Sequence, residues 1–88
     1  MIFCVMGRAS EAPTPPQTQP QRRNFMLAVD CEQADQAREA TNRALTSAGY
    51  SFITISRVLR ATGDIKDPAL NRIVDEARRN GIGYAIYR

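Results

Sequence analysis

The sequence predicts a small α/β domain in which three strands alternate with two helices. Five consecutive apolar residues, Phe25 to Val29, leave no polar face, which is typical of a strand covered on both sides. A single apolar stripe, Leu70, Ile73, Val74 and Ala77, has the i, i+3, i+4, i+7 spacing of a helix. The segments after residue 24 alternate between helical and strand patterns, so the predicted element order is β-α-β-α-β.

The first 23 residues are predicted to be a disordered tail. Residues 9–21 contain four of the five prolines, a composition that favours solvated, extended chain. Met1 to Met6 is apolar but shorter than a signal-peptide core, so it is interpreted as an extra edge strand or as sequence upstream of the true start. The predicted domain therefore comprises residues 24–88.

The predicted domain begins with a central strand from Asn24 to Cys31. Asp30 is expected to cap the following helix, with Gln33 three residues later as in a capping box. That helix is expected to run from about residue 31 to residue 48. Gly49 follows it, at the position where a left-handed residue commonly ends a helix.

The second strand is expected from Tyr50 to Arg60, because this segment is rich in β-branched and aromatic residues. Simple alternation places Ile53, Ile55, Arg57 and Leu59 on one face. Arg57 and Arg60 are then expected on opposite faces of the sheet.

The second helix has the clearest boundaries. Asp67 is predicted to be its N-cap and Pro68 its first residue, and Gly81 is predicted to end it. The last strand is expected over residues 82–87, with Tyr84 and Tyr87 on opposite faces.

These elements predict a three-stranded sheet of order 2-1-3. The all-apolar first strand prefers the middle, and the two helices are then expected to cover opposite faces. The alternative is a ferredoxin-like α+β two-layer sandwich that recruits one more strand from residues 1–6 or from a partner.

The composition indicates no catalytic residue set. The chain has no histidine and two cysteines, Cys4 and Cys31, so it lacks a conventional Ser-His or Cys-His pair and a four-ligand zinc site. No metal, cofactor or catalytic residue is predicted, and an enzyme is the least favoured class. No apolar run approaches the roughly 20 residues of a membrane span, so a cytoplasmic protein with no membrane partner is expected.

The net charge of +3 is divided between the two parts of the chain. Residues 1–23 carry three arginines against one glutamate, and the remaining 65 residues carry nine basic against eight acidic side chains. The nearly neutral domain makes nucleic acid the less favoured partner. The basic residues include 11 arginines and one lysine, which indicates a GC-rich bacterial or phage genome.

Two surfaces are candidate sites. In a parallel sheet, the carboxyl ends of the strands and the helix N-termini would form an anion-binding edge. Its predicted residues are Asp30, Arg60, Thr62, Gly63 and Lys66. The last strand would be an exposed sheet edge that pairs with another chain. Its predicted contact residues are Ile82, Tyr84 and Tyr87.

The favoured function is therefore a protein-interaction or regulatory module that forms a homodimer or binds another protein. The alternative is a nucleic-acid-binding accessory protein that uses scattered arginines. Those arginines are Arg22, Arg23, Arg57, Arg60, Arg72, Arg78 and Arg79.

Overall fold

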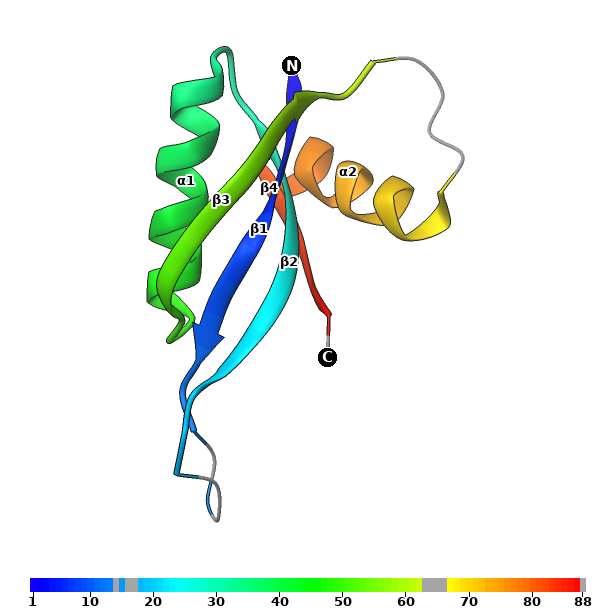
Figure 1. Ribbon diagram of the computed structural model, residues 1–88. Helices are drawn as coiled ribbons and strands as arrows, with labels where there is room; N and C mark the ends of the chain where they lie inside the picture. Colours follow the sequence, from blue (N-terminus) through cyan, green and yellow to red (C-terminus); the bar gives the residue numbers. More distant parts are fainter. Residues whose placement is uncertain (14, 16–17, 63–66, 88) are drawn as a thin grey trace.

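A four-stranded antiparallel sheet with one helix on each face is the architecture of this protein (Figure 1). The computed structural model describes residues 1–13, 15, 18–62 and 67–87. In chain order, the elements are β1 (Ile2–Glu11), β2 (Gln21–Asp30), α1 (Ala34–Ser47), β3 (Ser51–Arg60), α2 (Pro68–Asn80) and β4 (Ile82–Tyr87).

The strands lie in the order β3-β1-β2-β4, and every neighbouring pair is antiparallel. The predicted three-stranded sheet of order 2-1-3 is therefore wrong. Strand β1 lies between β2 and β3, so the two strands that α1 connects run in the same direction without pairing directly. The overall α/β class is nevertheless correct, because both helices follow strands and pack on the sheet.

The interpretation of residues 1–23 as a disordered tail fails for β1. Ten residues of β1 pair in register with ten residues of β2, from Ile2 opposite Asp30 to Glu11 opposite Gln21. Val5 and Ala9 are buried on one face of the sheet, and Cys4 is buried on the other. Residues 2–11 are therefore part of the folded sheet. The paired ends of β1 and β2 farthest from the N-terminus extend beyond the helices (Figure 1).

The two helices cover opposite faces of the sheet, as the apolar central strand predicts. Phe25, Leu27 and Val29 of β2 pack in the cluster that contains α1. Ala28 of the same strand packs in the cluster that contains Ile73 of α2. This three-layer arrangement differs from the ferredoxin-like alternative, in which both helices would lie on one face.

The start of α1 differs from the prediction. Gln33 is the N-cap, and its backbone amide donates a hydrogen bond to Oε1 of Gln36 at 3.1 Å, as in a capping box. Asp30 instead lies at the end of β2, where one carboxylate oxygen accepts a hydrogen bond from the terminal amine of Met1 at 2.9 Å.

The boundaries of α2 agree with the prediction. Oδ1 of Asp67 accepts hydrogen bonds from the amides of Ala69 and Leu70, and Pro68 is the first helical residue. Gly81 ends the helix in the left-handed conformation at φ 89°.

Strand β3 contains two register shifts that simple alternation does not predict. Ile55 pairs with Gly7 and Arg57 pairs with Met6, so Ser56 is an extra residue and forms a bulge. The bulge places Val58 beside the α1 core and leaves Leu59 on the opposite face, which corrects the predicted faces of this strand. Arg57 and Arg60 still point to opposite faces.

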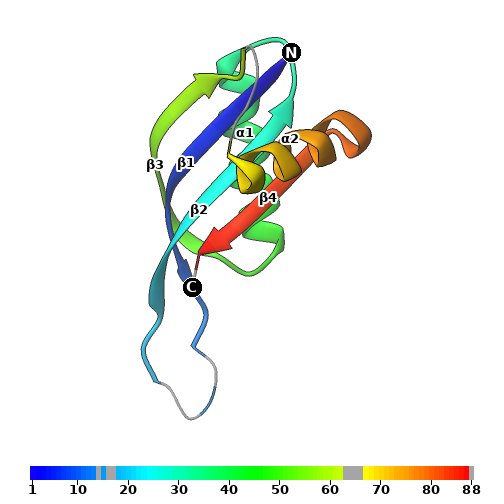
Figure 2. The same ribbon diagram turned by 90° about the vertical axis from the view of Figure 1, so that its right-hand side faces the viewer.

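Each helix covers only part of its face of the sheet. Helix α1 packs on β3, β1 and β2, whereas α2 packs mainly on β4 and β2 (Figure 2). Strand β4 is therefore uncovered on the α1 side, and part of β3 and β1 is uncovered on the α2 side. Neither helix of the described chain is long and apolar enough to cross a bilayer.

Candidate interaction surface

Strand β4 forms one edge of the sheet. It pairs with β2 on one side and with no strand of the described residues on the other. The outward N–H and C=O groups of such a strand form a template on which another strand can pair. Ile82, Tyr84 and Tyr87, the predicted contact residues, lie on this edge strand.

The opposite edge, β3, has the features that discourage strand pairing. It contains two register shifts, and Phe52 adopts a positive φ of 48° at the second of them. It also carries Arg57 and Arg60, both exposed. Strand β4 has a regular register and no charged residue from Ile82 to Tyr87. Since bulges and charges protect sheet edges, β4 is the unprotected edge.

The side chains of β4 present apolar surface on both faces of the sheet. Tyr84 is 57% exposed and Tyr87 is 45% exposed, and alternation places them on opposite faces. Ile82 and Ile86 share the α1 face with Tyr84 and are only partly buried, because α1 does not extend over β4.

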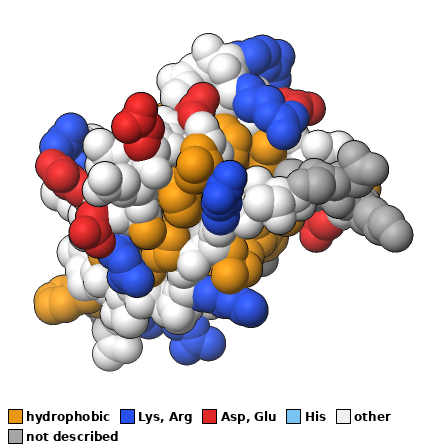
Figure 3. Space-filling model, turned by 90° about the horizontal axis from the view of Figure 1, so that it is seen from above, with side chains coloured by type: hydrophobic (Ala, Val, Ile, Leu, Met, Phe, Trp, Pro, Cys, Tyr) orange, Lys and Arg blue, Asp and Glu red, His pale blue; other side chains and the backbone are white. Residues whose placement is uncertain are grey.

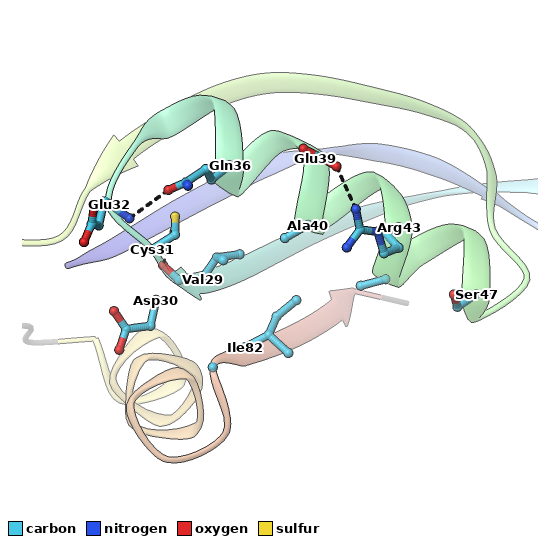
Figure 4. Close-up of a pocket in the computed structure, with 12 residues that line it drawn as sticks. Val29, Asp30, Cys31, Glu32, Gln36, Glu39, Ala40, Arg43, Ser47 and Ile82 are labelled. Carbon is cyan, nitrogen blue, oxygen red and sulfur yellow. Dashed lines mark hydrogen bonds and ion pairs between the residues drawn. The ribbon is translucent and has the colours of Figure 1, made fainter.

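A groove of about 760 Å³ separates α1 from β4. In Figure 4, the apolar side chains of Val29, Ala40 and Ile82 line the space between the helix and the strand. The helix side of the groove carries an ion pair between Glu39 and Arg43 at 2.6 Å. Seen from above, apolar side chains form an exposed band between charged ones (Figure 3). This groove extends the uncovered surface of β4 toward α1.

The predicted anion-binding residues are not brought together. Asp30 pairs with Ile2 in the β1 ladder and Arg60 pairs with Phe3, so their side chains lie on opposite faces and two strands apart. Asp30 is already ion-paired with the terminal amine of Met1. Thr62 is exposed beyond the end of β3. Two further predicted residues, Gly63 and Lys66, lie outside the described residues.

Several arginines of the nucleic-acid hypothesis have acidic partners. Arg23 pairs with Glu11 at 3.0 Å, Arg72 pairs with Glu76 at 2.7 Å, and Arg78 pairs with Asp75 at 3.3 Å. Arg79 donates to the backbone carbonyl of Asp75 within its own helix. These side chains therefore do not form one basic surface.

Arg8 is an exposed basic residue that the sequence analysis assigned to the tail. It lies on β1, opposite Asn24 of β2, and its Nε donates a hydrogen bond to Oδ1 of Asn24 at 3.0 Å. The alternation of Met6, Arg8 and Ser10 is the local signal that could have placed Arg8 on a sheet face.

The two thiols lie in different environments. Cys4 is 3% exposed, and burial raises its thiol pKa because it disfavours the thiolate. Cys31 is partly exposed and contacts the backbone carbonyl of Gln33 through its sulfur at 3.3 Å. Within the described part of the chain, no three His, Cys, Asp or Glu side chains are grouped to hold a metal ion.

Comparisons with protein-family models, with curated proteins and with solved structures found no match to this chain. Function is therefore inferred from the surface of the molecule.

Proposed function

We propose that this protein is a protein-interaction module that associates through the outer edge of β4, and that its partner is a second copy of the chain. The observation that carries the proposal is the contrast between the two sheet edges. Strand β3 is bulged and charged, whereas β4 is regular and uncharged from Ile82 to Tyr87. Antiparallel pairing of β4 with its copy would join two sheets into one.

Symmetry restricts the register of this pairing. A twofold axis perpendicular to the sheet keeps each face continuous, so directly opposed residues must point to the same side. Pairing Tyr84 with its own copy satisfies this condition and places Ile82 opposite Ile86. The apolar side chains on the α1 face then form one strip across the dimer, in which aromatic and β-branched pairs stabilise the sheet.

The charge distribution also supports self-association. No acidic or basic residue lies in β4 from Ile82 to Tyr87, so the paired strands bring no like charges together. In such a dimer, one groove would lie on each side of the two paired β4 strands. The apolar side of each groove would then adjoin the apolar strip centred on Tyr84.

Sedimentation velocity of the full chain at micromolar concentration tests this function. We expect a dimer for the unaltered chain and a folded monomer for Tyr84→Lys, because two lysines would face each other across the twofold axis. Leu59→Lys is the matched control, since Leu59 is 40% exposed on the opposite edge strand. This control is expected to remain dimeric. A monomeric unaltered chain, or an equal effect of both substitutions, would overturn the proposal.

The register has a separate test. Tyr84→Cys in a Cys31→Ser background would place two thiols opposite each other across the axis, where cross-strand Cβ atoms are about 4.5–5.5 Å apart. Mild oxidation is expected to yield a covalent dimer. Oxidation that leaves a sedimenting dimer without a covalent link would contradict the register centred on Tyr84.

A further inference from the structure

The uncovered part of the sheet on the α2 side is a second surface, here called the open face. Its residues lie on all four strands. Residues that are paired across neighbouring strands form rows that run across the sheet. Arg57, Met6, Met26 and Ala85 form one row across the sheet, and Thr54, Arg8, Asn24 and Tyr87 form the next. Arg22 lies one row further along, opposite Ser10. Figure 2 shows this face, with α2 lying across β4 and part of β2.

The open face carries one sign of charge. Arg8, Arg22 and Arg57 are exposed, and none of them has an ion-pair partner among the described residues. The rows contain no acidic residue. Asp67 begins the helix on this side, and its carboxylate caps the helix amides. The open face therefore attracts anions.

Two of the guanidinium groups are held in place by the sheet. Arg8 donates to Asn24, while Arg22 donates to Oγ of Ser10 at 3.2 Å and to the carbonyl oxygen of Phe52. A cavity of about 170 Å³ lies between these two arginines. Its lining residues are Gly7, Arg8, Arg22, Asn24, Thr54 and Ser56. Fixed guanidinium groups beside hydroxyl and amide groups are suited to bind a phosphate.

Apolar surface adjoins the charged groups. Met6 and Met26 lie side by side as a cross-strand pair at the border of the open face, where they pack partly against the α2 core and leave part of their side chains exposed. Tyr87 presents an exposed ring in the row of Arg8. Single-stranded nucleic acids are bound by basic surfaces combined with aromatic side chains on which bases stack, a role that Tyr87 can fill here, while the methionines add apolar contact.

We propose that the open face binds single-stranded nucleic acid, with a phosphate between Arg8 and Arg22 and bases against Met6, Met26 and Tyr87. The successive arginines lie one row apart, or roughly 6.8 Å along the strands. Phosphates recur along the backbone of a nucleic acid strand, so a strand that follows these rows can contact several arginines. This inference does not depend on the pairing of β4, because these side chains point away from the sheet face rather than along its edge.

An acidic peptide is the competing occupant, and the sheet geometry disfavours it. The backbone groups of the two inner strands, β1 and β2, are used within the ladders. An extended peptide on this face would gain no strand pairing there and would leave its own amides unpaired. A nucleic acid strand has no backbone amide to satisfy, and its bases gain from apolar contact.

Fluorescence anisotropy with the full chain and a labelled oligo(dT) of about 12 nucleotides tests the proposal. We expect binding that weakens as salt increases, with a slope of log affinity against log salt near −2 for three phosphates. Arg8→Gln and Arg57→Gln are each expected to weaken binding several-fold and to make this slope shallower by about 0.7. Circular dichroism confirms that each variant is folded.

Two controls distinguish binding at the open face from nonspecific electrostatic attraction of the oligonucleotide. Arg38→Gln removes the same charge from an exposed position on α1, on the other side of the sheet, and is expected to leave binding unchanged. Tyr87→Leu is expected to weaken binding without changing the salt slope, because it removes stacking and no charge. Absence of binding at low salt, or equal effects of Arg38→Gln and Arg8→Gln, would overturn the proposal.

Competition identifies the class of ligand. Unlabelled oligo(dT) is expected to displace the probe at lower concentration than poly-glutamate of equal charge or an abasic oligonucleotide. Displacement by poly-glutamate at the same or lower concentration would reject nucleic acid in favour of an acidic peptide. Equal displacement by the abasic strand would reject the contacts with bases.

Discussion

Gly83 of β4 lies directly against the backbone of α2, so a Cβ at this position would overlap the carbonyl oxygen of Ile73. The helix therefore rests on the strand without an intervening side chain. We expect Gly83→Ala to lower the free energy of unfolding by about 1–3 kcal/mol, the usual cost of overpacking a core. Chemical denaturation monitored by circular dichroism measures this change.

A control for Gly83→Ala is Asn71→Ala, an exposed position on α2. Its effect is expected to stay within about 0.5 kcal/mol. An unchanged denaturation midpoint for Gly83→Ala would show that α2 does not contact the strand as described.

Thr41 of α1 places a hydroxyl group in the core between this helix and the sheet. The residue is fully buried, and its hydroxyl has no hydrogen-bond partner among the described residues. A buried unpaired hydroxyl costs about 1–3 kcal/mol, so we expect the isosteric Thr41→Val to raise the free energy of unfolding by up to that amount. Thr46→Val, at an exposed position on the same helix, serves as the control. A clear loss of stability for Thr41→Val would reveal a partner for the hydroxyl.

The two cysteines are expected to differ in reactivity. Cys4 is buried with a raised thiol pKa, whereas Cys31 is partly exposed. A disulfide-exchange reagent at neutral pH should therefore modify Cys31 quickly and Cys4 only as the protein unfolds. The Cys31→Ser variant should lose the fast reaction. Rapid modification of Cys4 in this variant would contradict the burial of β1.

The raised pKa of Cys4 also predicts a pH dependence of stability. The thiol remains neutral in the folded protein at a pH where it ionises in the unfolded chain, near the ordinary value of about 8.5. The free energy of unfolding should therefore be independent of this group below that pH and fall above it. Denaturation curves of the unaltered chain and of Cys4→Ala, compared between neutral and alkaline pH, isolate this contribution.

Removal of residues 1–11 is expected to abolish folding. This segment is the whole of β1, and its loss would leave β2 and β3 without the strand that joins them. We expect circular dichroism and thermal melting to show no cooperative transition for the shortened chain. The full-length Arg8→Gln variant, altered at an exposed β1 position, should retain its transition. A shortened chain that melts like the intact one would restore the hypothesis of a disordered tail.

Local sequence signals predicted the elements whose boundaries are encoded locally. Asp67, Pro68 and Gly81 bound α2 through capping and backbone preferences that act within a few residues. The apolar run from Phe25 to Val29 predicted a strand covered on both faces. In the structure, one face of this strand packs against the α1 core and the other against the α2 core.

Strand β1 was predicted only as one of two interpretations of residues 1–6, as an edge strand, because its central position and its burial depend on distant partners. Its polar and small residues, such as Gly7 and Ser10, interrupt the apolar pattern that marks β2. Gly7 is required where β1 approaches β3, since a Cβ there would overlap the carbonyl oxygen of Thr54. Such a contact between residues far apart in the sequence leaves no periodic signal.

The candidate surfaces were predicted to different extents. Tyr84 and Tyr87 were expected on an exposed edge, because the last strand has no charge of its own before its end. Arg22 and Arg57 were among the arginines of the nucleic-acid hypothesis, but Arg8 was not, because the pairing of β1 between β2 and β3 is what brings Arg8 beside them. The bulge at Ser56 also changes which side chains of β3 reach each face.

The central position of the β1–β2 hairpin affects how the chain can fold during synthesis. These two strands leave the ribosome before the rest of the described domain, and they pair across the short separation from Glu11 to Gln21. Strand β3 then adds to the free side of β1, and β4 adds last to the free side of β2. No strand has to enter between two strands that are already paired, so the sheet can grow outward in the order of translation.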